Sequence, residues 1–334
     1  MNQTCRILAV LVAAGLSSAA DKPGKRAKVE PVVLGVKTAG VRVPYANLTP
    51  EASFALESAP AGILFTPGLA IADSAGVHWF DAKTNAAADK PASEVKIDKP
   101  CAGLLNAFGA VWAPSCATGE LVKSAKPGGG RIGSGAAPVA LTAIAASADS
   151  VWMLADAKST LLRIDPKENA IAAEIRLPVS CNSIVFAESA LWVTCPGERL
   201  LRIDPRTNLI DKRIEVAADP VSVTAGEGSI WVLGRKEGKI SRVDPKTNKV
   251  IATVELEIPN AEGMLAFGGG YLWASVHGFP LTRIVPATDK VAQQFPGAGG
   301  GRLWFGLGSL WLGSAESKTV ARIDPKRVLA TLPD

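Results

Sequence analysis

Tryptophan recurs along this chain at an almost constant interval, and that interval constrains the fold more than any other feature of the sequence. Six of the eight tryptophans follow one another at spacings of 40, 40, 39, 42 and 38 residues. They are Trp112, Trp152, Trp192, Trp231, Trp273 and Trp311. A fixed period of this length is typical of repeat architectures, in which each unit buries its apolar faces only against its neighbours.

A second motif follows the last five of these tryptophans after ten or eleven residues and ends in proline. The copies read RIDP from Arg163, RIDP from Arg202, RVDP from Arg242, RIVP from Arg283 and RIDP from Arg322. Two degenerate copies precede them, at 80–85 and at 121–123. The sequence therefore contains seven units of about forty residues.

Residues 220–258 show the secondary structure of one unit. Runs rich in β-branched and apolar residues alternate with turns that contain Gly, Asp, Pro and Asn. The expected strands are 220–225, 230–233, 239–243 and 250–256. Four short antiparallel strands repeated seven times predict an all-β fold, a seven-bladed β-propeller of four-stranded antiparallel blades over residues 31–334.

The repeated residues are expected to be scaffold. A large ring on the second strand fills the space between two twisted sheets, and the Arg and Asp of the second motif serve turns and contacts between blades. His78, between apolar neighbours in a strand, has the same structural interpretation. The strand that closes the ring is expected at 52–56, with 328–332 as the other candidate, whereas residues 32–43 match no part of the repeat.

The first thirty residues differ in composition from the rest. Arg6, an apolar stretch at 7–16 and small residues before position 20 predict a signal peptide over 1–20, followed by a basic flexible linker at 21–30. We therefore expect a periplasmic or secreted monomer without a membrane span, because the longest apolar stretch is too short to cross a bilayer. The formal charge of +5 is too small and too dispersed to indicate nucleic-acid binding.

Four cysteines follow the expected signal peptide, and they fall at matching places in two units. Cys101 and Cys181 each lie eleven residues before a repeat tryptophan, while Cys116 and Cys195 lie four and three residues after it. Each pair flanks the turn of a hairpin, so its members should face each other within disulfide reach. We expect the bridges Cys101–Cys116 and Cys181–Cys195; a zinc site is the alternative, although no Cys-x-x-Cys spacing occurs.

Candidate binding residues lie in the loops that lead into the first strand of a unit or join its second and third strands. In a propeller these loops share one face around the central channel. The main candidates are Asn182, Arg235, Glu262, His277 and Trp304, and the same face should carry Asp156, Lys158, Glu198, Arg199, Glu316 and Lys318. Trp304 stands out because the other units have Leu, Ala, Val or Thr at its position; its ring could fill the channel, which is the expected structural role, or stack on a ligand.

The motifs as a set resemble those of the YVTN-repeat and streptogramin-lyase-like (virginiamycin B lyase-like) propellers. The resemblance rests on the Gly-x-Leu-Trp-Val and Arg-Ile-Asp-Pro-x-Thr-Asn-x-Val patterns and covers about residues 60–334. It implies a propeller and, for the lyases, an elimination that uses a histidine on the loop face with nearby carboxylates and Mg²⁺. His277 is the matching catalytic candidate, but no carboxylate follows it within ten residues.

The expected function is therefore an exported, non-catalytic propeller that binds a small molecule, a peptide or an envelope protein on its loop face, with no cofactor or metal. The alternative is a divergent Mg²⁺-dependent carbon–oxygen lyase of the streptogramin B type that uses His277. The sequence supplies no complete set of catalytic residues in a known motif, which favours binding over catalysis.

Overall fold

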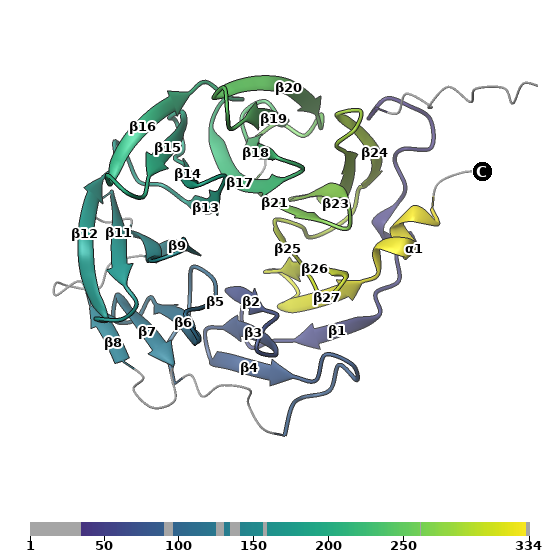
Figure 1. Cartoon of the computed structure of the whole chain (residues 1–334). Helices are drawn as coiled ribbons and strands as arrows, with labels where there is room; N and C mark the ends of the chain where they lie inside the picture. Colours follow the sequence, from purple (N-terminus) through teal and green to yellow (C-terminus); the bar gives the residue numbers. More distant parts are fainter. Residues whose placement is uncertain are drawn as a thin grey trace, which may run out of the picture. The chain divides into compact units, whose positions relative to one another are not determined.

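The structure is a computed structural model that describes residues 35–89, 96–124, 130–133, 141–155, 159–260 and 262–331. The expected signal peptide and basic linker lie outside these residues. The described residues form seven antiparallel sheets arranged as a ring (Figure 1), which confirms the predicted seven-bladed β-propeller. Blades are numbered below in chain order.

The first four blades follow one another along the chain. Blade 1 contains β2 (Gly62–Leu64), β3 (Leu69–Asp73) and β4 (Gly76–Phe80). Blade 2 contains β5 (Leu105–Ala107), β6 (Ala110–Ser115), β7 (Glu120–Ser124) and β8 (Gly130–Gly133). Blade 3 contains β9 (Leu141–Ala146), β10 (Val151–Ala155), β11 (Thr160–Asp165) and β12 (Ala170–Arg176). Blade 4 contains β13 (Ser183–Ala187), β14 (Ala190–Thr194), β15 (Leu200–Asp204) and β16 (Leu209–Ile214).

The last three blades complete the ring. Blade 5 contains β17 (Pro220–Gly226), β18 (Ser229–Gly234), β19 (Lys239–Asp244) and β20 (Lys249–Glu255). Blade 6 contains β21 (Gly263–Gly268), β22 (Tyr271–Val276), β23 (Phe279–Val285) and β24 (Lys290–Phe295). Blade 7 contains β25 (Arg302–Gly306), β26 (Ser309–Ser314), β27 (Thr319–Ile323) and, from the other end of the chain, β1 (Ala52–Ala55). A 3₁₀ helix, η1 (Tyr45–Asn47), and a helix, α1 (Pro325–Leu329), flank this blade in sequence.

Six blades have the four predicted strands, and blade 1 has three within the described residues. After β4 the chain turns through 81–85, and Ala87 pairs with Phe80 by a single bridge. The next residues include 90–95, which lie outside the described part of the chain. In every blade the first strand is innermost, and the inner strands of successive blades lie side by side around the axis (Figure 1).

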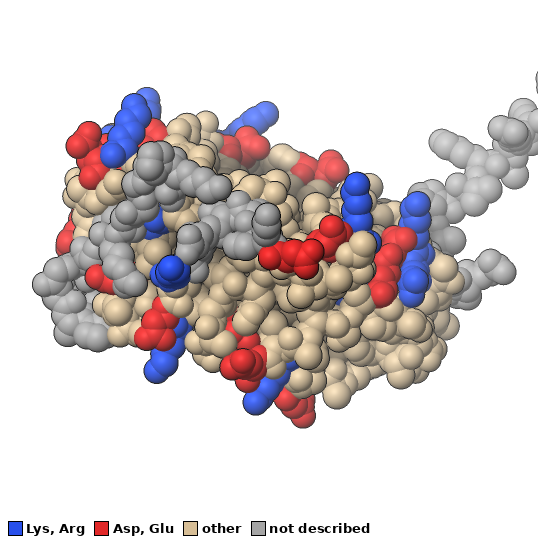
Figure 2. Space-filling model, turned by 90° about the horizontal axis from the view of Figure 1, so that it is seen from below, with Lys and Arg blue, Asp and Glu red and all other residues tan. Residues whose placement is uncertain are grey.

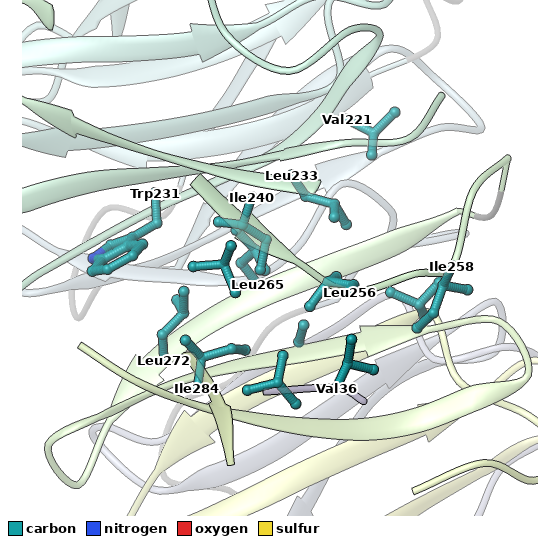
Figure 3. Close-up of a cluster of buried hydrophobic side chains, with 14 of the residues drawn as sticks. Val36, Val221, Trp231, Leu233, Ile240, Leu256, Ile258, Leu265, Leu272 and Ile284 are labelled. Atoms are coloured by element: carbon teal, nitrogen blue, oxygen red, sulfur yellow. The ribbon is translucent and has the colours of Figure 1, made fainter. Parts of the chain in front are cut away.

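The six repeat tryptophans are completely buried, so their predicted packing role is confirmed. Trp231 shows the common arrangement: its indole Nε1 donates to the carbonyl oxygen of Gly226 at 3.1 Å, and the Arg242 guanidinium lies 4.8 Å from the ring centroid. The ring sits in an apolar cluster that joins blades 5 and 6 (Figure 3). Such an aromatic wedge contributes buried area and a cation–π contact of about 0.5–1 kcal/mol.

The arginine of the second motif also connects neighbouring blades. Arg242 Nη1 donates to Pro286 O at 2.8 Å and to Asp289 Oδ1 at 3.0 Å, both in the turn of the next blade. The same contact reaches from blade 3 to blade 4 and from blade 7 to blade 1, where Arg322 binds Ala82 O and Asn85 Oδ1. Arg202 and Arg283 instead bind Asp211 and Gln293 of their own blades, so the predicted contact between blades is confirmed for three of the five arginines.

Blade 1 differs from the repeat at the positions of both the tryptophan and the arginine. Ala70 occupies the place of the tryptophan, and Trp79 occupies the place of the arginine opposite it, since Ala70 pairs with Trp79 as Trp311 pairs with Arg322. Next to this pair in the strand, the His78 ring contacts the buried Asp73 carboxylate at 2.9 Å. This contact supports the structural interpretation of His78.

The ring is closed by β1, as expected for residues 52–56. This strand pairs antiparallel with β27, with Ala52 opposite Arg322 and Ala55 opposite Thr319. The alternative strand at 328–332 is wrong, because residues 325–329 form α1. Asp324 accepts a hydrogen bond from the Lys326 amide and a proline occupies the first turn, which together start a helix.

Residues 36–43, which match no repeat, extend the outer edge of blade 6. Arg42 pairs in parallel with Gln294 of β24, whose backbone bonds to Val41 and Val43 at 2.8 and 3.0 Å. Val36 and Val41 are buried in the cluster between blades 5 and 6, where Figure 3 shows Val36. This segment therefore covers an outer strand edge that would otherwise be unpaired.

Both predicted disulfides are present. Cys101 and Cys116 have Cα atoms 5.8 Å apart, and Cys181 and Cys195 have Cα atoms 4.0 Å apart. Each bridge joins the two ends of an inner hairpin, in blade 2 and in blade 4. They fix the inner strands where those strands begin, which is also where the cavity described next is found.

Candidate functional site

The inner strands of all seven blades begin around one cavity on the channel axis, called here the channel mouth. Its volume is about 720 Å³. Each blade contributes at least one residue to its wall: Ala61, Gly103, Ala143, Ser183, Ser222, Met264 and Arg302. A cavity of this size is in the range that holds small-molecule ligands.

Most hydroxyl groups of the wall are already used to join the blades. Ser183 Oγ accepts the Val223 amide at 3.2 Å, and Ser222 Oγ accepts the Leu265 amide at 3.0 Å. Thr142 donates to the Cys181 carbonyl at 2.7 Å. These groups hold the inner strands of neighbouring blades together.

Asn182 lies in the wall at the start of β13. Its carboxamide oxygen accepts the Thr194 hydroxyl at 3.2 Å. Its carboxamide nitrogen has no hydrogen-bond partner among the residues that the structure describes. The side chain therefore offers two N–H donors to the cavity.

Glu262 lies in the wall at the start of β21, and Arg235 binds it from the loop after β18. The same guanidinium binds Asp219 through Nε at 2.7 Å and through Nη2 at 2.6 Å. The hydrogen bond that Arg235 donates to Asp219 raises its pKa, and the bond to Glu262 adds to this against the opposing effect of burial. Arg235 thus shares its single charge between Asp219 and Glu262.

Arg302 and Trp304 are the two residues of β25 that line the channel mouth. Successive side chains on a strand alternate in direction, so residues two apart lie on the same side. At the position of Arg302 the other units have Gly62, Gly103, Ala143, Ser183, Ser222 and Met264. Blade 7 therefore places two large side chains at the channel mouth, whereas the other blades have smaller or aliphatic residues at the same two positions.

The guanidinium of Arg302 has no hydrogen bond or ion pair with any of the described residues. The Arg302 side chain is exposed to the open channel, and the protein around it lowers its pKa. Trp304 is half-buried because it also packs against the apolar cluster between blades 7 and 1, and its indole N–H has no partner in the described part of the chain. The six repeat tryptophans, by contrast, all use theirs within the protein.

His277 is exposed in the loop after β22 and does not line the channel mouth. Its backbone amide donates to the Glu262 carbonyl at 3.0 Å, so the two residues are neighbours. The Glu262 carboxylate is bound to Arg235, however, and the imidazole has no hydrogen-bond partner among the described residues. The structure thus places His277 beside a carboxylate that is already paired.

The remaining candidates of the loop face are dispersed. Glu198 and Arg199 border a separate hollow together with Asp219. Arg199 forms an ion pair with Glu215, and Glu198 forms one with Arg213. Glu316 and Lys318 are exposed next to the turn before β27, and Asp156 and Lys158 lie outside the described residues. Acidic and basic side chains also lie interspersed on the face shown in Figure 2.

The channel mouth therefore brings together Asn182, Glu262 and Trp304, with Arg235 attached to Glu262. Sequence reasoning missed Arg302. The same comparison between units that singled out Trp304 would have found it, because no other unit has a charged residue at that position.

Within the described residues, no three His, Cys, Asp or Glu side chains gather in a way that could hold a metal ion. The Mg²⁺ implied by the resemblance requires oxygen ligands. Near His277 the contacting acidic residue is Glu262, whose carboxylate is held by Arg235. The described residues around His277 therefore do not fit a magnesium site.

No protein-family model matches the chain, and comparison with curated proteins finds no match. What is established is the fold, a seven-bladed β-propeller with two disulfides. Across the described ranges, no helix has the length and apolar character needed to cross a membrane.

Proposed function

We propose that this chain is an exported, non-catalytic β-propeller that binds a small molecule in the channel mouth. The observation that carries the proposal is the pair Arg302 and Trp304: one blade puts a guanidinium and an indole, both without partners among the described residues, into a cavity lined by all seven blades. Export is supported by the sequence of residues 1–20 and by the two disulfides, which persist in oxidising compartments.

The cavity suits a small molecule better than a protein partner. It is concave, and its wall combines apolar side chains with the polar groups of Asn182, Glu262 and Arg302, which could orient a ligand. A protein partner on the loop face would instead need a broad surface, typically about 800 Å² from each side. The scaffold is also well fixed there, because the disulfides and the hydroxyl contacts between blades hold the strand ends.

A lyase activity is less well supported. An elimination needs a base near the proton it removes and an electrophile near the leaving group. His277 lies outside the channel mouth, and the neighbouring carboxylate is paired with Arg235. Incubation of wild type and His277→Ala with a streptogramin B-type cyclic depsipeptide and Mg²⁺ tests this directly. We expect no turnover by either protein, and turnover that the substitution abolishes would refute the non-catalytic proposal.

The binding proposal is tested by thermal-shift screening with a library of sugars, peptides, quinones and small aromatic acids, amides and amines. A compound that binds the native state raises the melting temperature as its concentration increases. In Ala61→Phe/Ala143→Phe, two added rings narrow the channel mouth, and we expect the shift to disappear. The control Ala172→Phe, on the exposed outer strand of blade 3, should keep it. Shifts that persist in the double variant, or no shift by any compound, would contradict the proposal.

A further inference from the structure

Three side chains of the channel mouth keep hydrogen-bond donors that the described residues do not use. Asn182 offers carboxamide N–H groups, Trp304 an indole N–H and Arg302 the donors of a guanidinium. Some acceptors of the wall are engaged: Ser183 and Ser222 accept backbone amides, and one oxygen of Glu262 accepts Arg235. A ligand that pairs with the three free donor groups must supply acceptors.

One of the two charged residues of the wall has no ion pair. These residues are Glu262 and Arg302. Glu262 shares Arg235 with Asp219, whereas Arg302 has no ion pair with any of the described residues. An unpaired guanidinium is matched well by a carboxylate, because the planar fork matches two carboxylate oxygens.

The apolar part of the wall defines the rest of the ligand. Trp304 lies on the same side of β25 as Arg302, two residues along, and strand geometry separates two such positions by about 6.6 Å. Ile63, Leu104 and Ile144 line the cavity as well. A molecule whose carboxylate contacts Arg302 can thus place an aromatic or aliphatic body against the indole.

We infer that the channel mouth binds a small organic anion, a carboxylate on an aromatic or apolar body, with Arg302 holding the carboxylate and Trp304 contacting the body. This inference rests on the proposed function, since it specifies the class of molecule that the same cavity takes. It makes Arg302 the residue that selects for charge and Trp304 the residue that contributes affinity independent of charge.

The test compares 2-naphthoate with its uncharged amide, 2-naphthamide, by isothermal titration calorimetry. The two probes share one ring system and differ in charge, so their affinity ratio reports the contact with the guanidinium. We expect wild type to bind naphthoate at least tenfold more tightly than naphthamide. In Arg302→Gln the ratio should fall to about one, with the melting temperature showing that the variant is folded.

Two further variants separate the contributions. Trp304→Leu should weaken both probes by a similar factor and leave their ratio at tenfold or more. The control Arg176→Gln removes an exposed arginine on the outer strand β12 and should leave both affinities unchanged. The ratio should also fall as salt is added, since a partly exposed charge pair is screened.

The outcomes separate the preference for an anion from the proposed binding of small molecules in the channel mouth. If wild type binds both probes equally, or if Arg302→Gln retains the preference for naphthoate, the anion inference is wrong. Small-molecule binding in the cavity would still stand if Ala61→Phe/Ala143→Phe abolished the binding of either probe. If neither probe binds, the inference is also refuted, and the wider thermal-shift library then decides the proposed function.

Discussion

The closing strand β1 is held to blade 7 by one buried side chain, so Phe54→Ala tests how the ring is closed. Along Ala52–Ala55 only Phe54 is buried, at 4% exposure, while its neighbours face solvent or are half-buried. Its ring lies 4.8 Å from that of Phe80 in blade 1 and 5.7 Å from that of Trp311 in blade 7. Phe54 thus joins the two blades that the ends of the chain bring together.

The magnitude follows from these contacts. Truncating a buried phenylalanine to alanine removes its transfer free energy and leaves a cavity, which costs about 3–5 kcal/mol. The edge-to-face contact with Phe80 is part of that loss, at about 0.5–1.5 kcal/mol. The four residue pairs between β1 and β27 remain, so we expect the strand to stay paired but to open more often.

Urea unfolding followed by tryptophan fluorescence measures the global effect. With an m-value of about 3 kcal/mol/M, a loss of about 3 kcal/mol lowers the midpoint by about 1 M. Limited proteolysis should cut more quickly within 48–61. The matched control Ser53→Ala changes the exposed neighbour and should alter the unfolding free energy by about 0.5 kcal/mol at most. A loss below about 1 kcal/mol in Phe54→Ala, with unchanged proteolysis, would show that closure depends on other contacts.

Three further outcomes follow from individual contacts. Burial would raise the pKa of Asp73, but hydrogen bonds from the His78 ring and from backbone amides outweigh it and lower that pKa. The carboxylate therefore adds stability above its unfolded pKa of about 3.9, and that stability is lost as the pH falls through the lower folded value. Asp73→Asn should be less stable than wild type in urea at pH 7, and the difference should shrink toward pH 2; a constant difference would contradict this. Gly226→Ala places a methyl group against the Phe267 ring of the next blade and should cost about 1–3 kcal/mol in the same assay, whereas a loss below about 0.5 kcal/mol would show that the ring moves freely. Alkylation without reductant, followed by peptide mapping, should label none of the four bridged cysteines. Labelling of either pair would show that its disulfide is absent from the protein.

The architecture could be predicted from sequence because the packing between blades requires the same large residue at the same place. Where a blade meets that requirement differently, the pattern is lost. Blade 1 puts its indole on the third strand, at Trp79, and leaves Ala70 on the second, so counting tryptophans finds only six units. The residues after Asp324 alternate like a strand, yet the same Asp-Pro pair that begins a turn elsewhere begins a helix here.

The site could be predicted only in part, because the sequence indicates position but not pairing. The loop positions placed Asn182 and Glu262 near the axis, and comparison between units identified Trp304. The partner of Glu262 could not be inferred, since Arg235 comes from a different blade and also binds Asp219. His277 was a candidate because histidine is rare in this chain, but rarity does not show whether a side chain faces the cavity.

The inner strands also explain why Arg302 is informative. Seven strands converge on the axis, and six of the blades have glycine, alanine, serine or methionine at this position, so the packing of the ring does not call for a charged residue there. The Arg302 guanidinium has no hydrogen bond or ion pair with the described residues, so it contributes neither to the fold. The fold thus departs from its own repeat at a place where all seven blades share a cavity. A charged residue that the packing does not require keeps its interactions available to a ligand, as a binding site needs.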